Sequence, residues 1–278
     1  MTPKYLDAGE FKRVCAIAYR CAGIDIGANK VQMASARVRT RMRALSISDF
    51  TQYLDLAERD KVELGHLVDQ LTTNETRFFR EPAHFDFVAK NVWPTAQSPL
   101  RVWCAAASTG EEPYTIAMSI LENPGRGTPG AKILATDLSP TVVETAKKAC
   151  YDESRLKGVD SKLRKRYFKP SGQPNQYVVV PRARNMLHFA VLNLMGAWPM
   201  KGPFDIIFLR NVMIYFDAPT RQWLCRRMAT LLRPGGHLLI GHSETLGRSA
   251  PGLNSVQPAV YRRNNEPVFV GRRGGQAA

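Results

Sequence analysis

Residues 100–113 read LRVWCAAASTGEEP, and the order of these residues points to an α/β fold. The run at 100–106 is mostly apolar and has the length of a short buried strand. Small residues and a glycine follow it, and the next apolar stretch predicts a helix over residues 112–121. A strand that passes through a tight turn into a helix is the repeating unit of proteins with a parallel sheet.

The same alternation continues along the chain. Further strands are expected at residues 132–135, 204–209 and 237–241. One helix is expected to begin at Ser139 and Pro140, where a serine cap precedes a proline in the first turn. Another is expected at 221–232, followed by the turn Arg-Pro-Gly-Gly at 233–236. Strands that alternate with helices predict a doubly wound, Rossmann-like parallel sheet.

One segment departs from this alternation. Short strands without a helix between them are expected at residues 167–170, 176–180 and 186–192. Turn residues separate them, a pattern typical of an antiparallel meander or a pair of hairpins. We therefore expect a small antiparallel β insertion at about residues 165–190, at an edge of the main sheet.

Residues 1–72 predict a small all-α domain. An apolar stripe recurs there at helical spacing and consists of Val31, Ala34, Val38, Met42 and Leu45. Lys30, Arg37 and Arg41 lie together on one flank of that stripe, and the ordinary interpretation of such cations is a solvated helix face. Residues 73–92 are expected to link this domain to the α/β domain at 93–278, because polar, aromatic and proline residues interrupt the helical pattern.

The chain is strongly basic, and its charge is clustered. Its 278 residues include 39 Lys and Arg against 24 Asp and Glu, a formal net charge of +15. Residues 147–188 alone hold eleven basic and three acidic side chains. Because a basic field accelerates encounters with an acidic macromolecule, the expected partner is nucleic acid or an acidic protein surface.

Composition excludes several classes of protein. With 44% hydrophobic and 23% charged residues, the chain is neither collagen-like nor wholly disordered. No apolar run approaches the roughly 18 residues of a membrane span, so no insertion into a membrane is expected. Five cysteines without a C-x-x-C pair suggest neither a disulfide framework nor a zinc site, and no metal site is expected. We expect a cytoplasmic protein, with a monomer as the default state.

The residues after the first two strands of the α/β domain indicate the chemistry of a ligand. The alanines at 105–107 would let a ligand approach the backbone, but the loop is not G-x-G-x-x-G. Glu111 and Glu112 at a helix start would repel a pyrophosphate and suit a cation. Asp137 can accept hydrogen bonds from ribose hydroxyls, unless it is a simple helix cap, a role that Ser139 already fills. S-adenosylmethionine has a ribose, positive charge and no phosphate, and therefore fits these features.

Six stretches together resemble one family, the CheR chemotaxis receptor protein-glutamate O-methyltransferases. They are TNETRFFR at 73–80, WCAAASTGEEPY at 103–114, ATD at 135–137, LNL at 192–194, RNVMIYF at 210–216 and GHSE at 241–244. The helical region before them extends the likeness to nearly the whole chain. The resemblance implies a class I methyltransferase domain preceded by an all-α domain. It also implies S-adenosyl-L-methionine as the cofactor and S-adenosyl-L-homocysteine as its product.

The resemblance further implies which residues form the site. The implied cofactor-binding residues are Asn74, Thr76, Arg80, Glu111, Asp137, Asn193, Leu194, Asn211 and Val212. Their chemistry agrees, because Glu111 can accept from the amino group, Asp137 from the ribose and Asn193 from the adenine edge. Arg80 suits a carboxylate of the cofactor or of the substrate. Arg80 and Tyr215 are expected to be the catalytic residues, which orient the substrate carboxylate. For Asn211 the alternative is a turn residue at a strand end.

The implied substrate is a glutamate on the cytoplasmic helical domain of a chemotaxis receptor. Glutamate is ionised at neutral pH and needs no general base, which agrees with the lack of a Ser-His-Asp or Cys-His constellation. Lys30, Arg37 and Arg41 would then seat an acidic receptor surface. The β insertion resembles the part that in some relatives holds a tethering peptide at the receptor's C-terminus.

Two other functions are weighed against this one. A nucleic-acid methyltransferase would share the fold, cofactor and charge, but it should carry an Asn/Asp-Pro-Pro-Tyr/Trp strand end or a cysteine nucleophile. The corresponding strand end here reads RNVM at 210–213, and Cys104 lies inside a strand, so no nucleic-acid partner is expected. A sensor or receptor-docking module would bind the cofactor without turnover, although the complete set of site residues argues against it. His242 and Glu244 are expected to form a structural hydrogen-bonded pair rather than a catalytic dyad.

Overall fold

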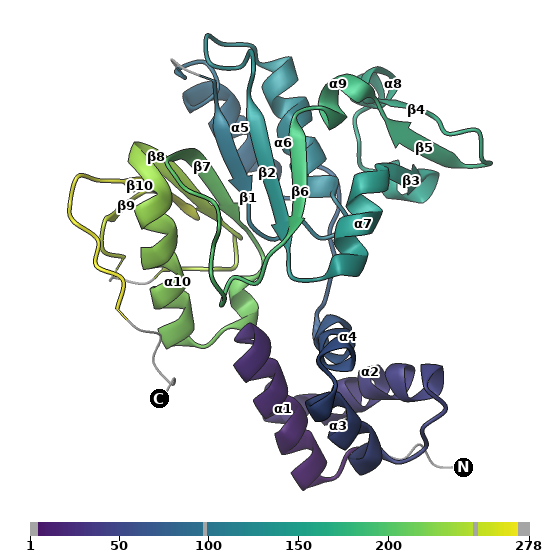
Figure 1. Cartoon of the computed structure of the whole chain (residues 1–278). Helices are drawn as coiled ribbons and strands as arrows, with labels where there is room; N and C mark the ends of the chain where they lie inside the picture. The colour runs from purple at the N-terminus through teal and green to yellow at the C-terminus, as the bar shows by residue number, and fades with distance from the viewer. Residues whose placement is uncertain (1–4, 97–98, 247–249, 272–278) are drawn as a thin grey trace. The chain divides into compact units, whose positions relative to one another are not determined.

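The computed structural model of the chain describes residues 5–96, 99–246 and 250–271 (Figure 1). The chain divides into two compact units. One unit comprises the chain up to Thr73 together with Tyr215–Thr220, and the other comprises Asn74–Ile214 and the chain from Arg221 onward. Among the described residues, no helix is both long and apolar enough to cross a membrane.

The first unit is built from helices, as the apolar periodicity predicts. They are α1 (Ala8–Ala22), η1 (Ala28–Lys30), α2 (Val31–Ala44), α3 (Phe50–Arg59) and α4 (Lys61–Leu71). Asp7 begins α1 with a capping box, in which its carboxylate accepts from the Glu10 N–H and Glu10 accepts from the Asp7 N–H. Such reciprocal caps satisfy backbone donors that the helix itself leaves without a partner.

The stripe predicted on α2 faces the core of this unit over most of its length. Ala34, Val38 and Met42 are buried. Leu45 is 39% exposed, because α2 ends at Ala44 and Leu45 is only its C-cap. The prediction is therefore correct for the middle of the helix and wrong at its last position.

The second unit is an α/β domain around a seven-stranded sheet (Figure 1). Its strands are β1 (Arg101–Cys104), β2 (Lys132–Asp137), β6 (Leu187–Val191), β7 (Phe204–Leu209), β8 (Leu232–Ile240), β9 (Leu253–Gln257) and β10 (Val260–Arg263). They lie in the order β6-β2-β1-β7-β8-β10-β9. The first five strands pair in parallel, and β10 pairs antiparallel with both β8 and β9. The strand order reverses between β1 and β7, and α/β sheets bind ligands at the carboxyl ends of strands at such a point.

Helices follow three of the parallel strands, as predicted: α6 (Glu111–Glu122) after β1, α7 (Pro140–Lys148) after β2 and α10 (Ala218–Leu231) after β7. A further helix, α5 (Pro82–Asn91), precedes β1 and lies in the segment that was expected to be a linker. The predicted start of α7 is confirmed, because Ser139 Oγ accepts from the Val142 N–H at 3.2 Å and Pro140 lies in the first turn. Residues 233–236, expected as a turn, lie within the bounds of β8 at a shift of register with β7, between the pairs Leu232/Phe204 and His237/Ile206.

The antiparallel insertion contains two of the three strands expected there, and its third strand is a different one. Its sheet has the order β3-β5-β4, from β3 (Cys150–Asp152), β4 (Phe168–Pro170) and β5 (Gln176–Val179). Three short helices accompany these strands, η2 (Glu153–Leu156), α8 (Ser161–Tyr167) and α9 (Pro181–Arg184). The strand expected at 186–192 is not part of this sheet, because as β6 it pairs in parallel with β2 at the edge of the main sheet. An apolar run identifies a strand but not its pairing partner, which explains the error.

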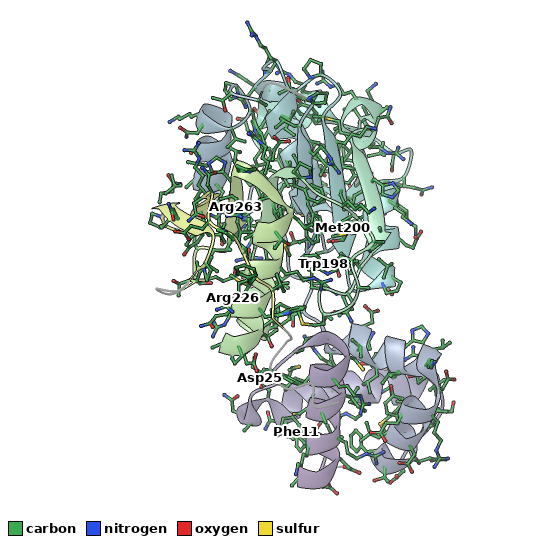
Figure 2. The ribbon with its side chains drawn as sticks, turned by 60° about the vertical axis from the view of Figure 1, so that its left-hand side comes forward. Phe11, Asp25, Trp198, Met200, Arg226 and Arg263 are labelled. Carbon is green, nitrogen blue, oxygen red and sulfur yellow. The ribbon has the colours of Figure 1, made fainter. Side chains whose placement is uncertain are left out.

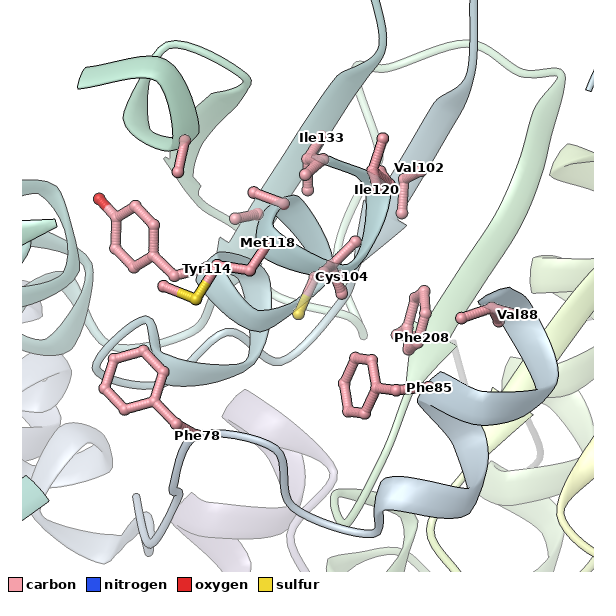
Figure 3. Packing of buried hydrophobic residues seen from close by; sticks show 14 of the residues in the cluster. Phe78, Phe85, Val88, Val102, Cys104, Tyr114, Met118, Ile120, Ile133 and Phe208 are labelled. Atoms are coloured by element: carbon pink, nitrogen blue, oxygen red, sulfur yellow. The ribbon is translucent and has the colours of Figure 1, made fainter. Parts of the chain in front are cut away.

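Apolar side chains fill the space between the main sheet and its helices. Figure 3 shows Tyr114, Met118 and Ile120 of α6 in the same buried cluster as Val102 and Cys104 of β1. Each of these five side chains is at most 1% exposed. This packing makes β1 a rigid base for the loop that follows it.

A pair of tryptophans packs at the same strand. Trp103 is fully buried, and its indole N–H donates to Thr136 Oγ1 at 2.9 Å. Its ring meets that of Trp198 edge to face, with the ring centroids 5.0 Å apart. Figure 2 labels Trp198 in the α/β unit. The buried indole nitrogen of Trp103 therefore has its partner in β2, the strand that ends at Asp137.

Candidate cofactor and active site

The predicted polar residues of the α/β unit follow the carboxyl ends of four neighbouring strands. Glu111 comes after β1, Asp137 ends β2, Asn193 follows β6 and Asn211 follows β7. These strands are adjacent in the order β6-β2-β1-β7. The four residues therefore share one edge of the sheet, although they lie far apart in the sequence.

Asp137 fixes the loop after β1. Its Oδ2 accepts from the Ser108 N–H at 2.8 Å, and its Oδ1 accepts from the Ser139 N–H at 3.0 Å. Ser139 itself caps α7, so Asp137 is not the cap of that helix. A carboxylate held in this way presents acceptor oxygens at a strand end, which is the chemistry that a ribose diol requires.

Glu111 is the first residue of α6, and its side chain is completely buried. Thr109 Oγ1 donates to its Oε2 at 2.6 Å, and Arg155 Nε donates to its Oε1 at 2.9 Å. Arg155 Nη2 contacts the same Oε1 and lies 3.2 Å from Thr109 Oγ1. The carboxylate expected to accept the cofactor's ammonium is thus paired with a cation of the chain. The sequence analysis did not single out Arg155, which is one of many basic residues in the insertion.

The turn before Glu111 needs a glycine. Gly110 has φ 99°, and a Cβ at this position would lie 2.7 Å from the hydroxyl of Tyr151. That hydroxyl donates to the Thr109 carbonyl at 2.8 Å. The loop after β1 is therefore tied to β3, the strand of the insertion that the sequence analysis missed.

Asn211 is held by two carboxylates. Its backbone N–H donates to Glu244 Oε2 at 3.1 Å, and its side-chain Nδ2 donates to Glu81 Oε1 at 3.0 Å. Its φ of 56° is left-handed, which agrees with the alternative of a turn residue at a strand end. A Cβ on Gly241 would lie 2.5 Å from Asn211 Nδ2, so this glycine leaves the space that the amide occupies. Val212, the next predicted residue, is half-buried.

A buried ion cluster next to Asn211 was not predicted. The guanidinium of Arg210 is fully buried and donates to Glu112 Oε2 at 2.6 Å and to Glu81 Oε2 at 3.0 Å. It also contacts the backbone carbonyl of Arg80. Burial raises the pKa of Glu112. Burial acts in the same direction on Glu81, but hydrogen bonds from Asn211 and Arg210 outweigh it and lower the pKa of Glu81 to about 2.

The segment at 74–81 approaches the loop after β1. The Asn74 carbonyl accepts from Ser108 Oγ at 2.8 Å, and the Phe79 N–H donates to Thr115 Oγ1 of α6 at 3.1 Å. Arg80 Nη1 donates to the Glu75 carbonyl at 3.0 Å. Thr76 lies in the same segment and is half-buried. The structure therefore brings Asn74 to the loop that Asp137 also holds.

The loop after β6 contains the other two predicted residues. Asn193 Oδ1 accepts from the Met195 N–H at 2.9 Å, a side-chain turn that fixes the direction of the asparagine. Leu194 is buried, and its carbonyl accepts from Arg227 Nη1 of α10 at 3.2 Å. The same arginine lies over the ring of Trp198, 3.7 Å from its centroid.

Tyr215, predicted as a catalytic residue, belongs by its contacts to the helical unit. It ends the short helix η3 (Met213–Tyr215), and its carbonyl accepts from the Asp25 N–H at 2.8 Å. Arg80, the other predicted catalytic residue, belongs to the α/β unit. The described contacts thus place the two predicted catalytic residues in different units.

Two of the three cations predicted to dock the substrate have partners within the helical unit. Arg37 donates to the last carbonyl of α4 at 2.6 Å and to Thr73 Oγ1 at 2.7 Å. Arg41 pairs with Glu63 at 2.7 Å. Burial opposes ionisation of Glu63, yet hydrogen bonds from Arg41 and Tyr53 lower its pKa below the ordinary value. Lys30 is exposed.

The expected hydrogen bond between His242 and Glu244 is not formed. Glu244 instead accepts from three backbone N–H groups, including that of Gly241 at 2.6 Å. The His242 N–H donates to Glu81 at 3.2 Å, and its ring lies edge-on to the buried ring of His84, with centroids 4.4 Å apart. In the described part of the chain, ligand atoms of Glu81, His84 and His242 lie within 4.8 Å of one another, the spacing of a candidate metal site. Arg210 already neutralises the carboxylate of this group, which works against binding of a metal cation there.

The donor set fits S-adenosylmethionine better than a nucleotide with phosphates. Asp137 offers acceptors at a strand end, and Glu111 is a buried carboxylate with a positive group beside it. That positive group shows that the position next to Glu111 favours a cation, as the cofactor's ammonium requires. A phosphate would meet two carboxylates, Glu111 and Glu112, at the start of α6.

Two family models match this chain, and together they cover most of it. The family model described as "CheR methyltransferase, all-alpha domain" matches residues 9–72, and that described as "CheR methyltransferase, SAM binding domain" matches residues 74–260. The chain is 40% identical over 257 residues to chemotaxis protein methyltransferase 2 of Pseudomonas aeruginosa, which covers 91% of this chain and 92% of the relative. It is also 40% identical over 244 residues to the chemotaxis protein methyltransferase of Escherichia coli K12, over 86% and 85% of the two chains.

Proposed function

Since the chain belongs to the CheR methyltransferase family, a family of S-adenosylmethionine-dependent chemotaxis protein methyltransferases, we propose that it methylates glutamate side chains of chemotaxis receptors. The products are a glutamyl methyl ester and S-adenosylhomocysteine. The substrate segment is the helical cytoplasmic domain of the receptor, and the enzyme works in the cytoplasm as a monomer. The reaction adjusts the receptor's output during sensory adaptation.

The observation that carries this proposal is the set of acceptors at the carboxyl ends of β1 and β2. Asp137, held by the loop after β1, accepts from the ribose of the cofactor, and Glu111 accepts from its ammonium. Asn193 accepts from the adenine edge. The remaining contacts with the cofactor come from Asn74, Thr76, Arg80, Leu194, Asn211 and Val212.

The chemistry asks little of the protein beyond alignment and exclusion of water. The cofactor supplies a methyl group bound to a sulfonium, so that sulfur can leave as a neutral thioether. A glutamate oxygen of the substrate forms the new C–O bond as the S–C bond breaks, and no proton moves because the glutamate is already ionised. Arg80 and Tyr215 orient that carboxylate, by a guanidinium and a hydroxyl that can each donate to it. Excluding water from the oxygen strengthens it as a nucleophile.

The helical domain at 1–72 is the receptor-docking part, and residues 73–92 contribute to the cofactor site of the methyltransferase domain at 93–278. Lys30 is exposed on the helical domain, and Arg37 and Arg41 lie on the same flank of α2. Receptor methylation sites lie on acidic helices in this proposal, and a basic helix face speeds their encounter. Because Glu63 neutralises Arg41, Lys30 and Arg37 carry more of this attraction. The β insertion at about 165–190 is a second place for a receptor segment.

A nucleic-acid methyltransferase is the weaker alternative. Base chemistry by a cysteine nucleophile needs an accessible thiolate. Cys104 is fully buried, and burial raises the pKa of its thiol well above the ordinary value. The end of β7 carries Arg210 and Asn211, which are engaged by Glu81 and are not followed by prolines.

Mapping of the methyl groups tests the proposal. A receptor cytoplasmic fragment is incubated with S-adenosylmethionine and the enzyme, then digested and analysed by mass spectrometry. We expect a gain of one methylene on specific glutamates, lost in Arg80→Ala and retained in the control Arg77→Ala, whose side chain is exposed. Cofactor binding without any methylated receptor glutamate would instead support a sensor or docking module, and methylated nucleic acid would support the alternative.

A further inference from the structure

We propose that Arg155 takes the place of the cofactor's ammonium at Glu111 and leaves this position when the cofactor binds. This inference rests on the proposed role of Glu111 in the cofactor site. Arg155 comes from η2 of the β insertion. Binding of the cofactor is then an exchange of one cation for another at a buried carboxylate.

Donors of the chain already engage both carboxylate oxygens of Glu111. Arg155 Nε donates to Oε1 at 2.9 Å, and Nη2 contacts the same oxygen. Thr109 Oγ1 donates to Oε2 at 2.6 Å and is itself 3.2 Å from Arg155 Nη2. Three donors therefore engage the two oxygens in the described structure. Because the Glu111 side chain is completely buried beneath these contacts, an ammonium reaches its carboxylate only if one of them moves away, and the arginine is the only charged donor.

Exposure decides which partner can move. The Glu111 side chain is 0% exposed, whereas the Arg155 side chain is 41% exposed. A buried carboxylate without a cation is strongly unfavourable, so Glu111 needs a positive partner in both the free and the bound protein. Arg155 can exchange its ion pair for solvent at little cost, because its long side chain already reaches the surface.

This arrangement predicts a selectivity for the amino-acid end of the ligand. A molecule that carries an ammonium replaces the charge of Arg155, and Glu111 stays paired throughout. A molecule with the same adenosine and thioether but no amino-acid end, 5′-methylthioadenosine, gives Glu111 no replacement and leaves the arginine in place. The competition therefore weakens binding of S-adenosylhomocysteine but not of 5′-methylthioadenosine.

Calorimetric titration of the full chain tests the exchange. Arg155→Ala is compared with the wild type and with Arg164→Ala, which removes an arginine of the same insertion that pairs with Glu153 instead. We expect Arg155→Ala to bind S-adenosylhomocysteine about two- to fivefold more tightly, the factor expected for loss of a partly exposed competing ion pair. Binding of 5′-methylthioadenosine should not change, and Arg164→Ala should match the wild type for both ligands.

A second neutral variant and a double variant separate the possible results. Arg155→Gln also removes the charge, so it should bind S-adenosylhomocysteine as tightly as Arg155→Ala, and it serves as the test if Arg155→Ala folds poorly. The double variant Glu111→Gln/Arg155→Ala should not show this gain in affinity. Equal or weaker binding of S-adenosylhomocysteine by both Arg155 variants overturns the exchange and leaves the proposed function intact. If the wild type and all variants bind neither ligand, the assignment of the cofactor site is wrong, and the proposed exchange is refuted together with it.

Discussion

Replacing Glu81 by glutamine tests whether the buried ion cluster stabilises the site residue Asn211 and the domain around it. The carboxylate of Glu81 accepts from Arg210 at 3.0 Å, from Asn211 Nδ2 at 3.0 Å and from the His242 N–H at 3.2 Å. Glutamine has the same shape, but it is neutral, and its amide NH2 would face a group that is itself a hydrogen-bond donor. The change therefore removes charge with little change of volume.

The magnitude follows from the pKa of Glu81, which falls from 4.5 to about 2. At about 1.4 kcal/mol per pKa unit, the charged form gains about 3 kcal/mol in the folded protein. The side chain is only 14% exposed, so solvent screens this gain little. Glutamine keeps part of the hydrogen bonding, so we expect Glu81→Gln to lower the free energy of unfolding by about 2 kcal/mol. This corresponds to a fall of roughly 4–8 °C in the midpoint temperature of thermal unfolding.

The pH dependence gives an independent check with a fixed sign. The unfolded state binds a proton at Glu81 below about pH 4.5, whereas the folded state binds it only near pH 2, so stability from this group rises with pH between these values. The difference in unfolding free energy between wild type and Glu81→Gln should be largest at neutral pH and should shrink as the pH falls from about 4.5 to about 2. Urea denaturation across the pH range measures it, with the exposed Glu75→Gln as control. Equal stability of Glu81→Gln and wild type at neutral pH would refute the reasoning.

Three further changes test other parts of the site. Asp137→Ala should weaken binding of S-adenosylhomocysteine by about 10- to 100-fold in calorimetry, because a charged acceptor is lost; unchanged affinity would exclude the ribose contact. Tyr215→Phe should lower kcat for receptor methylation without changing cofactor affinity, and an unchanged kcat would remove the tyrosine from the catalytic residues. Gly241→Ala places a Cβ 2.5 Å from Asn211 Nδ2, so both the unfolding midpoint and cofactor affinity should fall. A variant that melts like the wild type would show that Asn211 has room to move.

Local sequence signals predicted the central strands and the helix that follows each. Residues 100–106 and 132–135 gave β1 and β2, and Ser139 was correctly identified as the cap of α7. These features are encoded by neighbouring residues, through apolar runs and the hydrogen bonds of a single cap. The position of Asp137 at the carboxyl end of β2 follows from the same signals, because a parallel sheet places strand ends at one edge.

Features that depend on distant partners were not predictable. Arg155 and Glu111 are separated by 44 residues, and Arg210 and Glu112 by 98, so nothing in the local pattern marks these pairs. The strand at β6 was assigned to the insertion for the same reason, since its parallel partner β2 lies across a long connection. The expected pair of His242 and Glu244 failed because Glu244 binds backbone N–H groups instead.

The cations on one flank of α2 show that a charge pattern does not by itself distinguish a docking surface from internal ion pairs. Lys30, Arg37 and Arg41 share that flank, yet Arg37 holds the end of α4 and Arg41 holds Glu63. A side chain with internal partners can still attract an acidic surface, but less of its charge is available. The pattern alone does not separate the two roles, because both need a cation at the same helical spacing.

The most direct test of the central claim is transfer of a labelled methyl group from S-adenosylmethionine to a receptor cytoplasmic domain from the same cell. We predict label bound to the receptor that mild alkali releases as methanol, as a glutamyl methyl ester requires, and none with Arg80→Ala. Absence of receptor label from wild-type enzyme that binds the cofactor, tested with several receptors, would contradict glutamate methylation by this site.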